Sequence, residues 1–482
     1  MSRHLIDLLK GLKPRRALFT TFTANVAFFD AAVFPALSSG DGCETSVLVD
    51  ARQFGTASQA SFSRDAGMQY TIAPVKAPGG GIFHPKLAFI ETVDDQILAV
   101  GSGNLTPAGL CGQLESWDVS RRSEHPHLFV ELSGFFSELG VKIRETSPRA
   151  SAILVKAARR AGPGSTMLPS GPRDIRLVHT LAESAASQLV KAVDEHGHKA
   201  RRLTVLSPFH TAGGGAIRTL AASLGVRKVH LGHDGRAGFN LDWYSDLVAE
   251  SGFVVPRLEG PRDICGALHA KVYQVQTSDG LLTMTGSVNA TTRSLHGVRN
   301  VEVAVARWEK ASAFRWTPQQ PNTFEPAEFP EGEDAGLLVE AAIEGRAFVS
   351  GLVVLPAGLQ RPASLQWQLL EAEQQLAEGQ APVDGRGHFR FEILPERSKR
   401  PVSLNLVVRI GQLIGYAWLN DEEALYNVGL SRMLDPRLRR AADGLIDVDS
   451  ALYIRQLLNV ALGKQPPAKA KAKKAGAGAA GT

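Results

Sequence analysis

Two stretches of the sequence, far apart in the chain, carry the same five residue types in the same order. The first copy consists of His84, Lys86, Ser102, Asn104 and Glu115, and the second consists of His269, Lys271, Ser287, Asn289 and Glu302. In both copies the histidine precedes the lysine by 2 positions and the asparagine by 20, and the copies lie 185 residues apart. A single His-x-Lys often arises by chance. Two copies of the whole pattern indicate an internal repeat.

The residue types of one copy suit the binding and transfer of a phosphate. On a β-strand, a histidine and a lysine two positions later point to the same face. The ammonium group supplies positive charge, and the Gly-Ser-x-Asn that follows supplies neutral donors for the non-bridging oxygens. The glycines allow the backbone to approach closely. The glutamate could accept a hydrogen bond from an imidazole and so fix its tautomer.

Two such half-sites that face each other would present two histidines to one phosphorus atom. One imidazole can attack, giving a phosphohistidine, while the other protonates the leaving oxygen and then activates water. No carboxylate cage for a divalent cation accompanies the motifs, so we predict no metal and no other cofactor. Because one chain holds both copies, a monomer can form the complete site.

The repeated constellation resembles the phospholipase D superfamily, which has two His-x-Lys…Asp motifs, each followed by Gly-Ser-x-Asn. The resemblance covers residues 10–310. It implies an α/β fold, with two lobes related by a pseudo-twofold axis in a layered α-β-α arrangement and an active site between them. It also implies a metal-independent, two-step reaction on a phosphodiester.

The resemblance assigns a role to each matching position. It implies that the catalytic histidines are His84 and His269, the phosphate binders Lys86, Lys271, Asn104 and Asn289, the motif serines Ser102 and Ser287, and the orienting acids Glu115 and Glu302. In the superfamily the histidine of the first motif is most often the nucleophile. In this chain the two half-sites are too alike for the residue pattern by itself to say which histidine attacks and which acts as acid and base. The family's aspartate is replaced by Glu91 and Gln276. Tyrosyl-DNA phosphodiesterase-like members also lack it, which argues against the lipid-cleaving branches.

The first hypothesis is therefore a cytoplasmic, metal-independent phosphodiesterase that acts on DNA or RNA, a nuclease. Proteins of this kind resemble components of bacterial restriction and anti-phage systems, which implies a helicase or ATPase as a candidate partner. A lipid phosphodiesterase or phosphatidyltransferase is the alternative. A non-catalytic module that binds nucleic acid or protein is the second alternative, against which the intact histidines of both copies argue.

Alternating strands and helices must position these motifs. Strands are expected at 45–50, 72–75, 87–91, 96–100, 175–179, 203–207, 228–231, 271–276 and 281–285, and helices at 181–193, 215–224 and 242–251. Residues 148–173 resemble a connection between lobes. The expected domains are lobe 1 at 1–160, lobe 2 at 161–310, a linker at 311–333, a β-sandwich-like domain at 334–425, a helical segment at 426–463 and a disordered tail at 464–482.

Composition sets the class of protein. With 44% hydrophobic and 21% charged residues, the chain is typical of a globular protein rather than a disordered or fibrous one. The cysteines Cys43, Cys111 and Cys265 are too few for a disulfide framework, and no apolar run reaches 18 residues, so we predict no stable membrane insertion. Five of the 53 basic residues lie in 464–482, and the other 48 balance the 48 acidic ones. The tail is either a passive terminus or a weak polyanion tether.

Other residues near the motifs are weaker candidates, and a structural role is the simpler interpretation for most of them. They are His210, Arg293, His296, Trp117 and Trp308, the basic residues Lys156, Arg159, Arg160, Arg437, Arg439 and Arg440, and the glycines Gly213, Gly214 and Gly215.

Overall fold

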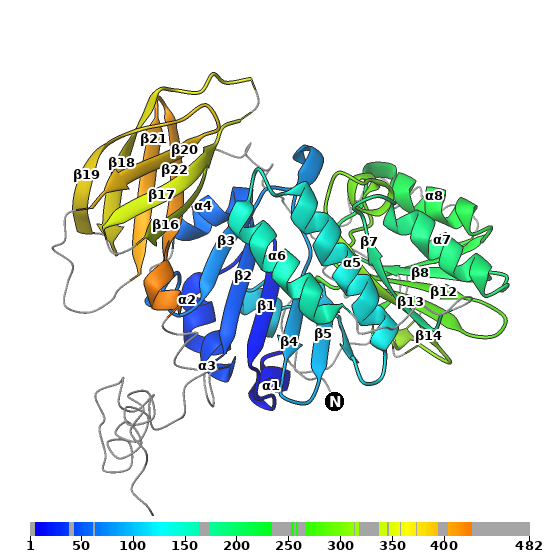
Figure 1. Ribbon diagram of the computed structural model, residues 1–482. Helices are drawn as coiled ribbons and strands as arrows, with labels where there is room; N and C mark the ends of the chain where they lie inside the picture. Colours follow the sequence, from blue (N-terminus) through cyan, green and yellow to red (C-terminus); the bar gives the residue numbers. More distant parts are fainter. Residues whose placement is uncertain are drawn as a thin grey trace, which may run out of the picture. The chain divides into compact units, whose positions relative to one another are not determined.

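The computed structural model shows a mixed α/β architecture with three large β-sheets (Figure 1). It describes residues 5–37, 43–60, 63–162, 173–233, 252–254, 257–258, 267–312, 314–317, 337–344, 347–356, 358–372, 374–393 and 403–426. The helix expected at 242–251, most of the linker, nearly all of the helical segment and the tail lie outside these residues.

The first sheet has six strands in the order β3-β2-β1-β4-β5-β6. Its strands are β1 (Arg16–Thr21), β2 (Glu44–Asp50), β3 (Thr71–Val75), β4 (Leu87–Glu91), β5 (Gln96–Gly101) and β6 (Trp117–Arg121). β1, β2 and β3 are parallel, and β4, β5 and β6 continue the sheet in antiparallel pairs. Pro74 lies in β3 at the sheet edge, where its missing N–H is tolerated.

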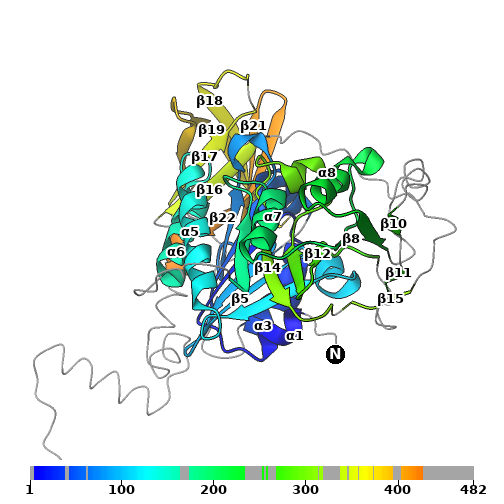
Figure 2. The same ribbon diagram turned by 90° about the vertical axis from the view of Figure 1, so that its right-hand side faces the viewer.

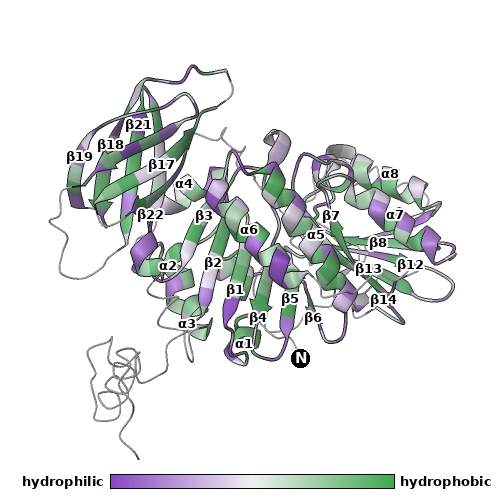
Figure 3. Cartoon of the chain, viewed as in Figure 1, coloured by the Kyte–Doolittle hydropathy of each residue, from purple (hydrophilic) through white to green (hydrophobic). Residues whose placement is uncertain are grey.

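Helices cover both faces of this sheet. The helices of the first half are α1 (Leu5–Lys10), α2 (Val26–Phe28), the π-helical turn η1 (Phe29–Val33), α3 (Phe34–Leu37), α4 (Ala51–Ala60), α5 (Pro126–Lys142) and α6 (Pro148–Ala161). α5 and α6 share one core with the sheet, in which Phe89 contacts Phe129 and Phe136 at ring-centroid distances of 6.3 and 5.9 Å (Figure 1). Strands β4 and β5 are largely hydrophobic (Figure 3). No described helix is long and apolar enough to cross a membrane.

The helix α6 corrects the expectation of an irregular connection over residues 148–173. Pro148 occupies its first turn, where the missing N–H costs nothing. The alanines that made the segment resemble a linker form a small-residue face, with Leu154, that is buried against α5. The described part of this segment is thus a packed helix.

The second sheet has seven strands in the order β10-β9-β8-β12-β13-β14-β7. Its strands are β7 (Ile175–His179), β8 (Arg202–Leu206), β9 (Lys228–Gly232), β10 (Phe253–Val254), β12 (Val272–Gln276), β13 (Leu281–Gly286) and β14 (Val303–Glu309), and β11 (Arg257–Leu258) pairs separately with β15 (Trp316–Thr317). The helices α7 (Ala185–Glu195) and α8 (Gly215–Ser223) pack on one of its faces (Figure 2). The run β9-β8-β12-β13-β14 repeats the order and strand directions of β2-β1-β4-β5-β6.

The third sheet is formed by residues 338–421. Its strands are β16 (Leu338–Glu344), β17 (Phe348–Val354), β18 (Ser364–Glu371), β19 (Gln374–Pro382), β20 (His388–Glu392), β21 (Leu404–Ile410) and β22 (Leu413–Asp421), in the order β19-β18-β21-β22-β16-β17-β20. The rings of Trp367 and Phe391 stack at 3.9 Å, and Val383, just past β19, bridges to Phe389 of β20. The strands thus form one curled sheet whose edges meet.

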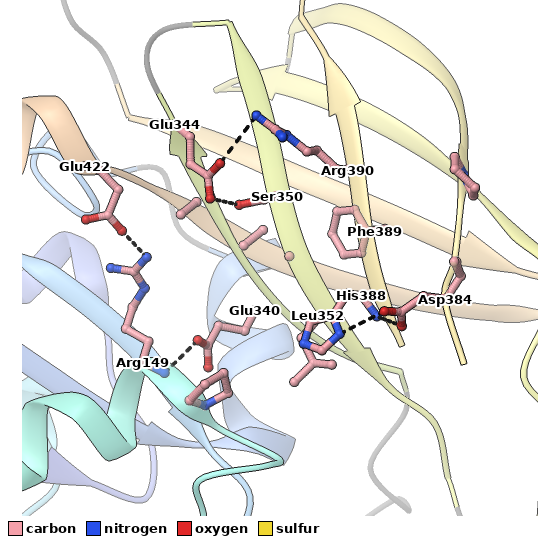
Figure 4. A pocket seen from close by; sticks show the side chains of 16 residues that line it. Arg149, Glu340, Glu344, Ser350, Leu352, Asp384, His388, Phe389, Arg390 and Glu422 are labelled. Carbon is pink, nitrogen blue, oxygen red and sulfur yellow. Dashed lines mark hydrogen bonds and ion pairs between the residues drawn. The ribbon is translucent and has the colours of Figure 1, made fainter. Parts of the chain in front are cut away.

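This third sheet packs against the edge of the first. The side-chain amide of Asn420 bonds to both the N–H and the carbonyl of Ile72, at 3.2 and 2.9 Å, and so covers the open edge at β3. Beside it, the Glu340 carboxylate accepts a 2.9 Å hydrogen bond from the Arg149 N–H at the start of α6 (Figure 4). Burial raises the pKa of Glu340 to about 7.

Candidate active site

The two motif copies meet through an exchange of backbone segments. Phe83 forms a parallel bridge with Val301, and the His84 N–H donates to the Val301 carbonyl at 2.9 Å. In the other copy, Leu114 and Leu268 form the equivalent parallel bridge. The N–H of His269, the residue after Leu268, donates to the Leu114 carbonyl at 2.9 Å. Each histidine segment therefore pairs with the glutamate segment of the other copy.

The side chains repeat this exchange. His84 Nδ1 lies 2.8 Å from Glu302 Oε2, and His269 Nδ1 lies 2.7 Å from Glu115 Oε1. A carboxylate at Nδ1 holds the proton on that nitrogen and leaves the Nε2 lone pair available for attack or proton transfer. The glutamates can thus orient the imidazoles, and each serves the histidine of the opposite copy.

The two serines fix the glutamates. The hydroxyl groups of Ser102 and Ser287 donate to Glu115 and Glu302, respectively. Each hydroxyl also accepts the N–H of the residue after the glutamate, from Ser116 at 2.9 Å and from Val303 at 3.1 Å. Because a hydroxyl has one proton, these serines are engaged as positioning groups in this arrangement and do not offer that proton to a phosphate.

The two lysines are buried close to the histidines. Lys86 Nζ donates to the His84 carbonyl at 3.1 Å, and Lys271 Nζ donates to the His269 carbonyl at 2.6 Å. Burial lowers the pKa of Lys86 to about 7 and holds the pKa of Lys271 well below its ordinary value. Within the described residues neither ammonium group forms an ion pair with a carboxylate. The nearby carboxylates of Glu302 and Glu115 act to raise the pKa values of both lysines, and a bound phosphate would add a direct counter-charge.

The histidines are held neutral at rest. Burial lowers the pKa of His84 to about 4 and also lowers the pKa of His269. The positive charge of each copy acts on the other, since Lys271 lowers the pKa of His84 and Lys86 lowers the pKa of His269. Burial opposes the charged form of Glu302, yet His84 and Lys86 outweigh it and keep the pKa of that carboxyl below its ordinary value.

The asparagines differ in their contacts. Asn104 Oδ1 lies 3.4 Å from Thr21 Oγ1, whose single proton is donated to the nearer Thr23 carbonyl at 2.7 Å. Asn289 Oδ1 is buried and makes no hydrogen bond to any described residue. A ligand N–H or O–H could satisfy it, and an amide flip would instead present its NH₂ to a phosphate oxygen.

A further matched pair supports the asparagines and was missed in the sequence. Thr21 Oγ1 accepts the Leu105 N–H at 3.1 Å, and Ser207 Oγ accepts the Ala290 N–H at 3.1 Å, each from the residue after the motif asparagine. Both hydroxyls also donate to the carbonyl two residues later. Thr21 and Ser207 each stand at the end of a central strand and are 186 positions apart, close to the 185-residue spacing of the motifs. That matched spacing is the sequence signal that could have identified them.

Glu91 and Gln276, five positions after the motif lysines, lie at the other end of the strands. Five residues of extended chain place Glu91 and Gln276 about 16 Å from the motif lysines. Glu91 pairs with Arg160 Nε at 2.6 Å and with Arg16, opposite it in β1, at 4.0 Å. Gln276 accepts from Arg202, opposite it in β8. Both side chains thus bind an arginine of the neighbouring strand.

The weaker candidates have structural partners. His210 Nε2 lies 2.8 Å from the Ser207 carbonyl, and His296 Nε2 lies 2.8 Å from the Ala216 carbonyl. Trp117 packs on the motif glycine Gly101, where a Cβ atom would lie 2.3 Å from the ring. Trp308 packs on His196 and His198, Arg160 pairs with Glu91, and Gly213 to Gly215 lie at the turn that leads into α8. Lys156, Arg159 and Arg293 are exposed. The remaining candidates, Arg437, Arg439 and Arg440, lie outside the described residues.

No group of three or more metal-ligating side chains occurs among the residues that the structure describes. The groups available at this site are imidazole, ammonium, carboxylate, hydroxyl and carboxamide.

Comparison with known proteins finds distant structural likenesses. A polyphosphate kinase from Porphyromonas gingivalis aligns with 63% of this chain at 13% identity and a TM-score of 0.35, and this chain spans 42% of the kinase. NucT from Helicobacter pylori aligns over 27% of this chain and 84% of its own, at 16% identity and a TM-score of 0.20. No protein-family model matches the sequence, and no curated protein matches it. The chemistry is therefore argued from the side chains of the site.

Proposed function

We propose that this chain is a metal-independent phosphodiesterase that cleaves nucleic acid through a phosphohistidine intermediate. In this proposal the two halves are phospholipase D-like lobes related by a pseudo-twofold axis. The observation that carries it is the reciprocal pairing of His84 with Glu302 and of His269 with Glu115. Two oriented imidazoles beside two buried ammonium groups supply a nucleophile, an acid and a phosphate cradle.

The first step uses His84 as the nucleophile. Its Nε2 lone pair attacks phosphorus, the P–N bond forms, and the bond from phosphorus to the leaving oxygen breaks. The negative charge of the bound phosphate favours the imidazolium form of His269, which is neutral in the free site, and that imidazolium gives its proton to the leaving oxygen. Lys86 and Lys271, with the carboxamides of the motif asparagines, bind the non-bridging oxygens and balance the developing charge.

The second step reverses the roles of acid and base. His269, now neutral, takes a proton from water, and the oxygen of that water attacks phosphorus as the P–N bond breaks. His84 returns to its neutral form, with its proton on Nδ1 facing Glu302. The proposed steps need no Lewis acid, because side-chain charges stabilise both transition states.

The choice of nucleic acid over lipid is supported by the positions at Glu91 and Gln276. The family's aspartate is absent there, as in tyrosyl-DNA phosphodiesterase-like members, and both side chains bind arginines instead. A cytoplasmic location, a role in anti-phage defence and a helicase or ATPase partner are further predictions from the resemblance.

The test is a set of cleavage assays with the full chain in excess EDTA. Substrates are single- and double-stranded DNA, RNA, bis(p-nitrophenyl) phosphate, and phosphatidylcholine and phosphatidylglycerol vesicles. We expect nucleic acid to be cleaved, His84→Ala to abolish cleavage, and His388→Ala, a matched control at an exposed histidine of β20, to retain it. Loss of activity in EDTA with recovery in Mg²⁺ would overturn the mechanism. Cleavage of lipid alone would favour the lipid alternative, and binding without hydrolysis would favour the non-catalytic module.

A further inference from the structure

A buried carboxylate next to the first motif takes no direct part in the two chemical steps. Asp50 is the last residue of β2 and is 1% exposed. Its Oδ2 accepts the N–H of Phe83, the residue before His84, at 2.6 Å. Its Oδ1 accepts the N–H of Arg52 at 2.9 Å, in the manner of a helix N-cap at the start of α4. Capping therefore accounts for one oxygen only, and the other oxygen holds the histidine segment.

The chain that leads into His84 is held from two sides. A terminal nitrogen of Arg52 donates to the Gly80 carbonyl at 3.1 Å. From the second half of the chain, the Val301 N–H donates to the Ile82 carbonyl at 2.9 Å. The end of β2 and the second half therefore fix the path by which the backbone enters the first motif.

A hydroxyl group fixes the backbone just after His84. Thr20 Oγ1 donates to the Pro85 carbonyl at 3.0 Å and accepts the Leu87 N–H at 3.3 Å. At the same register in the second sheet stands Leu206, which has no hydroxyl group. The backbone of the proposed nucleophile is thus held by side chains before and after the imidazole, and the second copy lacks the later of these two supports.

Asp50 also acts on the charge of Lys86. Burial raises the pKa of Asp50 to about 6, against the backbone N–H groups that favour its charged form, so the carboxylate is ionised at neutral pH. Its charge raises the pKa of Lys86, as do the charges of Glu302 and Glu115. Lys271 and the two motif histidines are titratable groups that also interact with Lys86. The glutamates are engaged with imidazole and serine side chains, whereas the hydrogen bonds of Asp50 come from backbone N–H groups.

We infer that Asp50 is a positioning residue for the proposed reaction, which fixes the backbone that carries His84 and keeps Lys86 in its ammonium form. It does so without touching the phosphate. The inference rests on the proposed function, in which His84 attacks and Lys86 binds a non-bridging oxygen. The sequence supports it, because the Asp-x-Arg of residues 50–52 recurs at 234–236, 184 positions later and close to the 185-residue spacing of the motifs. The second Asp-x-Arg lies outside the described residues.

Two substitutions separate charge from geometry at this position. Asp50→Asn keeps an oxygen that can accept the Phe83 N–H and removes the negative charge, whereas Asp50→Ala removes both. The control is Asp30→Asn, because Asp30 is another carboxylate of the first half that accepts hydrogen bonds, from Ser63 and Tyr70. Each full-length variant is assayed for kcat and KM on bis(p-nitrophenyl) phosphate as a function of pH.

Asp50→Asn should move the alkaline limb of kcat/KM to lower pH by about one unit, because an ammonium group that loses a nearby anion gives up its proton more easily. The loss should consist mainly of a higher KM near neutral pH, and it should vanish on the acid side, where Lys86 is charged in both proteins. Asp30→Asn should leave the limb in place. An alkaline limb that does not move in Asp50→Asn would overturn the action on Lys86.

Asp50→Ala should also lower kcat by about tenfold at every pH, because the backbone of His84 is no longer held in one position. Wild-type kcat in this variant would overturn the positioning role. Asp50→Asn preserves the shape of the side chain, so the pH profile remains a valid test even if Asp50→Ala folds poorly.

A measurement without turnover distinguishes this inference from the proposed function. NMR of protein labelled with carbon-13 at lysine Cε follows the titration of Lys86, with Lys86→Arg protein to assign its signal. The midpoint should fall by about one pH unit in Asp50→Asn and stay in place in Asp30→Asn. A protein that shows this shift but hydrolyses no diester would overturn the proposed function and retain the action of Asp50 on Lys86. A protein that hydrolyses the diester and shows no shift would overturn the inference alone.

Discussion

The two half-sites have the same residues and different environments. The His84 side chain is 9% exposed and its partner Glu302 is 1% exposed, against 15% and 5% for His269 and Glu115. Glu302 accepts from His84, Ser287 and Ser294, so three side chains fix it. Glu115 is held by His269 and Ser102.

The contacts of the two lysine ammonium groups also differ between the copies. Both ammonium groups donate to the backbone carbonyl of the histidine two residues earlier, and Lys271 Nζ also lies 2.9 Å from His269 Nε2. The more deeply buried and better fixed imidazole suits a nucleophile, which must approach phosphorus along one line. The more open imidazole beside a cation suits an acid and base that exchanges protons with the leaving group and water. A duplicated motif can thus provide two roles through differences in burial and in side-chain contacts.

Replacing the histidines should have the largest effect. His84→Ala should lower kcat on bis(p-nitrophenyl) phosphate by at least about 10³-fold, since the P–N bond can no longer form. His269→Asn should still form the adduct, because nitrophenolate leaves without a proton, and should hydrolyse it slowly. Mass spectrometry of acid-quenched protein locates the adduct. Finding it on His269 in His84→Ala protein would reverse the assignment, and full activity in both variants would remove the two-histidine mechanism.

Replacing the glutamates should have the next largest effect and should differ between halves. Glu302→Gln and Glu115→Gln should each lower kcat by about 10²- to 10⁴-fold, because an amide no longer fixes the productive tautomer. The loss should be greater for Glu302→Gln, which also disturbs Ser287 and Ser294. Glu145→Gln, at an exposed position, is the control. Equal losses in the two variants would show that the environments do not matter to catalysis.

The pH profile should report the buried half-site. His84 attacks only when neutral, so kcat/KM should rise as pH increases through about 4, the value to which burial lowers its pKa. Lys86 binds phosphate only when charged, so activity should fall as pH rises through about 7. With bis(p-nitrophenyl) phosphate, the acid limb should persist in His269→Ala protein. An acid limb near the ordinary histidine pKa of about 6.5 would show that His84 is solvated.

The sequence predicted some of the strands and the residues of the site, but not the pairing of the glutamates with the histidines. Short apolar runs predicted the strands that became β7, β8 and β13, since β propensity and spacing are local properties. The matched spacing of the motifs identified residues that the structure brings together at one site. The spacing did not reveal which glutamate contacts which histidine. That pairing depends on long-range backbone bridges such as Phe83 to Val301, which brings together His84 and Glu302, 218 positions apart in the sequence.

Several helices and strands were missed, and for β19, β22 and α6 the reason can be identified. β19 is mostly exposed, so its polar residues lack the alternation that marks a strand. β22 follows β21 after a turn of two residues, and the gap between apolar runs is too short to separate them by pattern. α6 is rich in alanine, arginine and serine, and only its burial against α5 shows that these residues form a helix face.

The smallest effect is expected at Glu91 and Gln276, five positions after the motif lysines. Glu91 forms ion pairs with Arg160 and Arg16 at the strand end opposite the lysines. Glu91→Gln should therefore lower the free energy of unfolding by about 1–3 kcal/mol, through the loss of a part-buried charged contact. It should leave kcat on bis(p-nitrophenyl) phosphate unchanged. Gln276→Glu should instead gain up to about 1 kcal/mol, because a carboxylate can pair with Arg202.

Urea titration measures both changes, with Glu145→Gln as the control at an exposed acid. The two substitutions should move stability in opposite directions, since one copy already holds the ion pair and the other holds a neutral hydrogen bond in its place. A tenfold fall in kcat for Glu91→Gln at unchanged stability would mean that this position acts on the reacting phosphate from about 16 Å along the strand. The assignment of a purely structural role to this end of β4 would then be wrong.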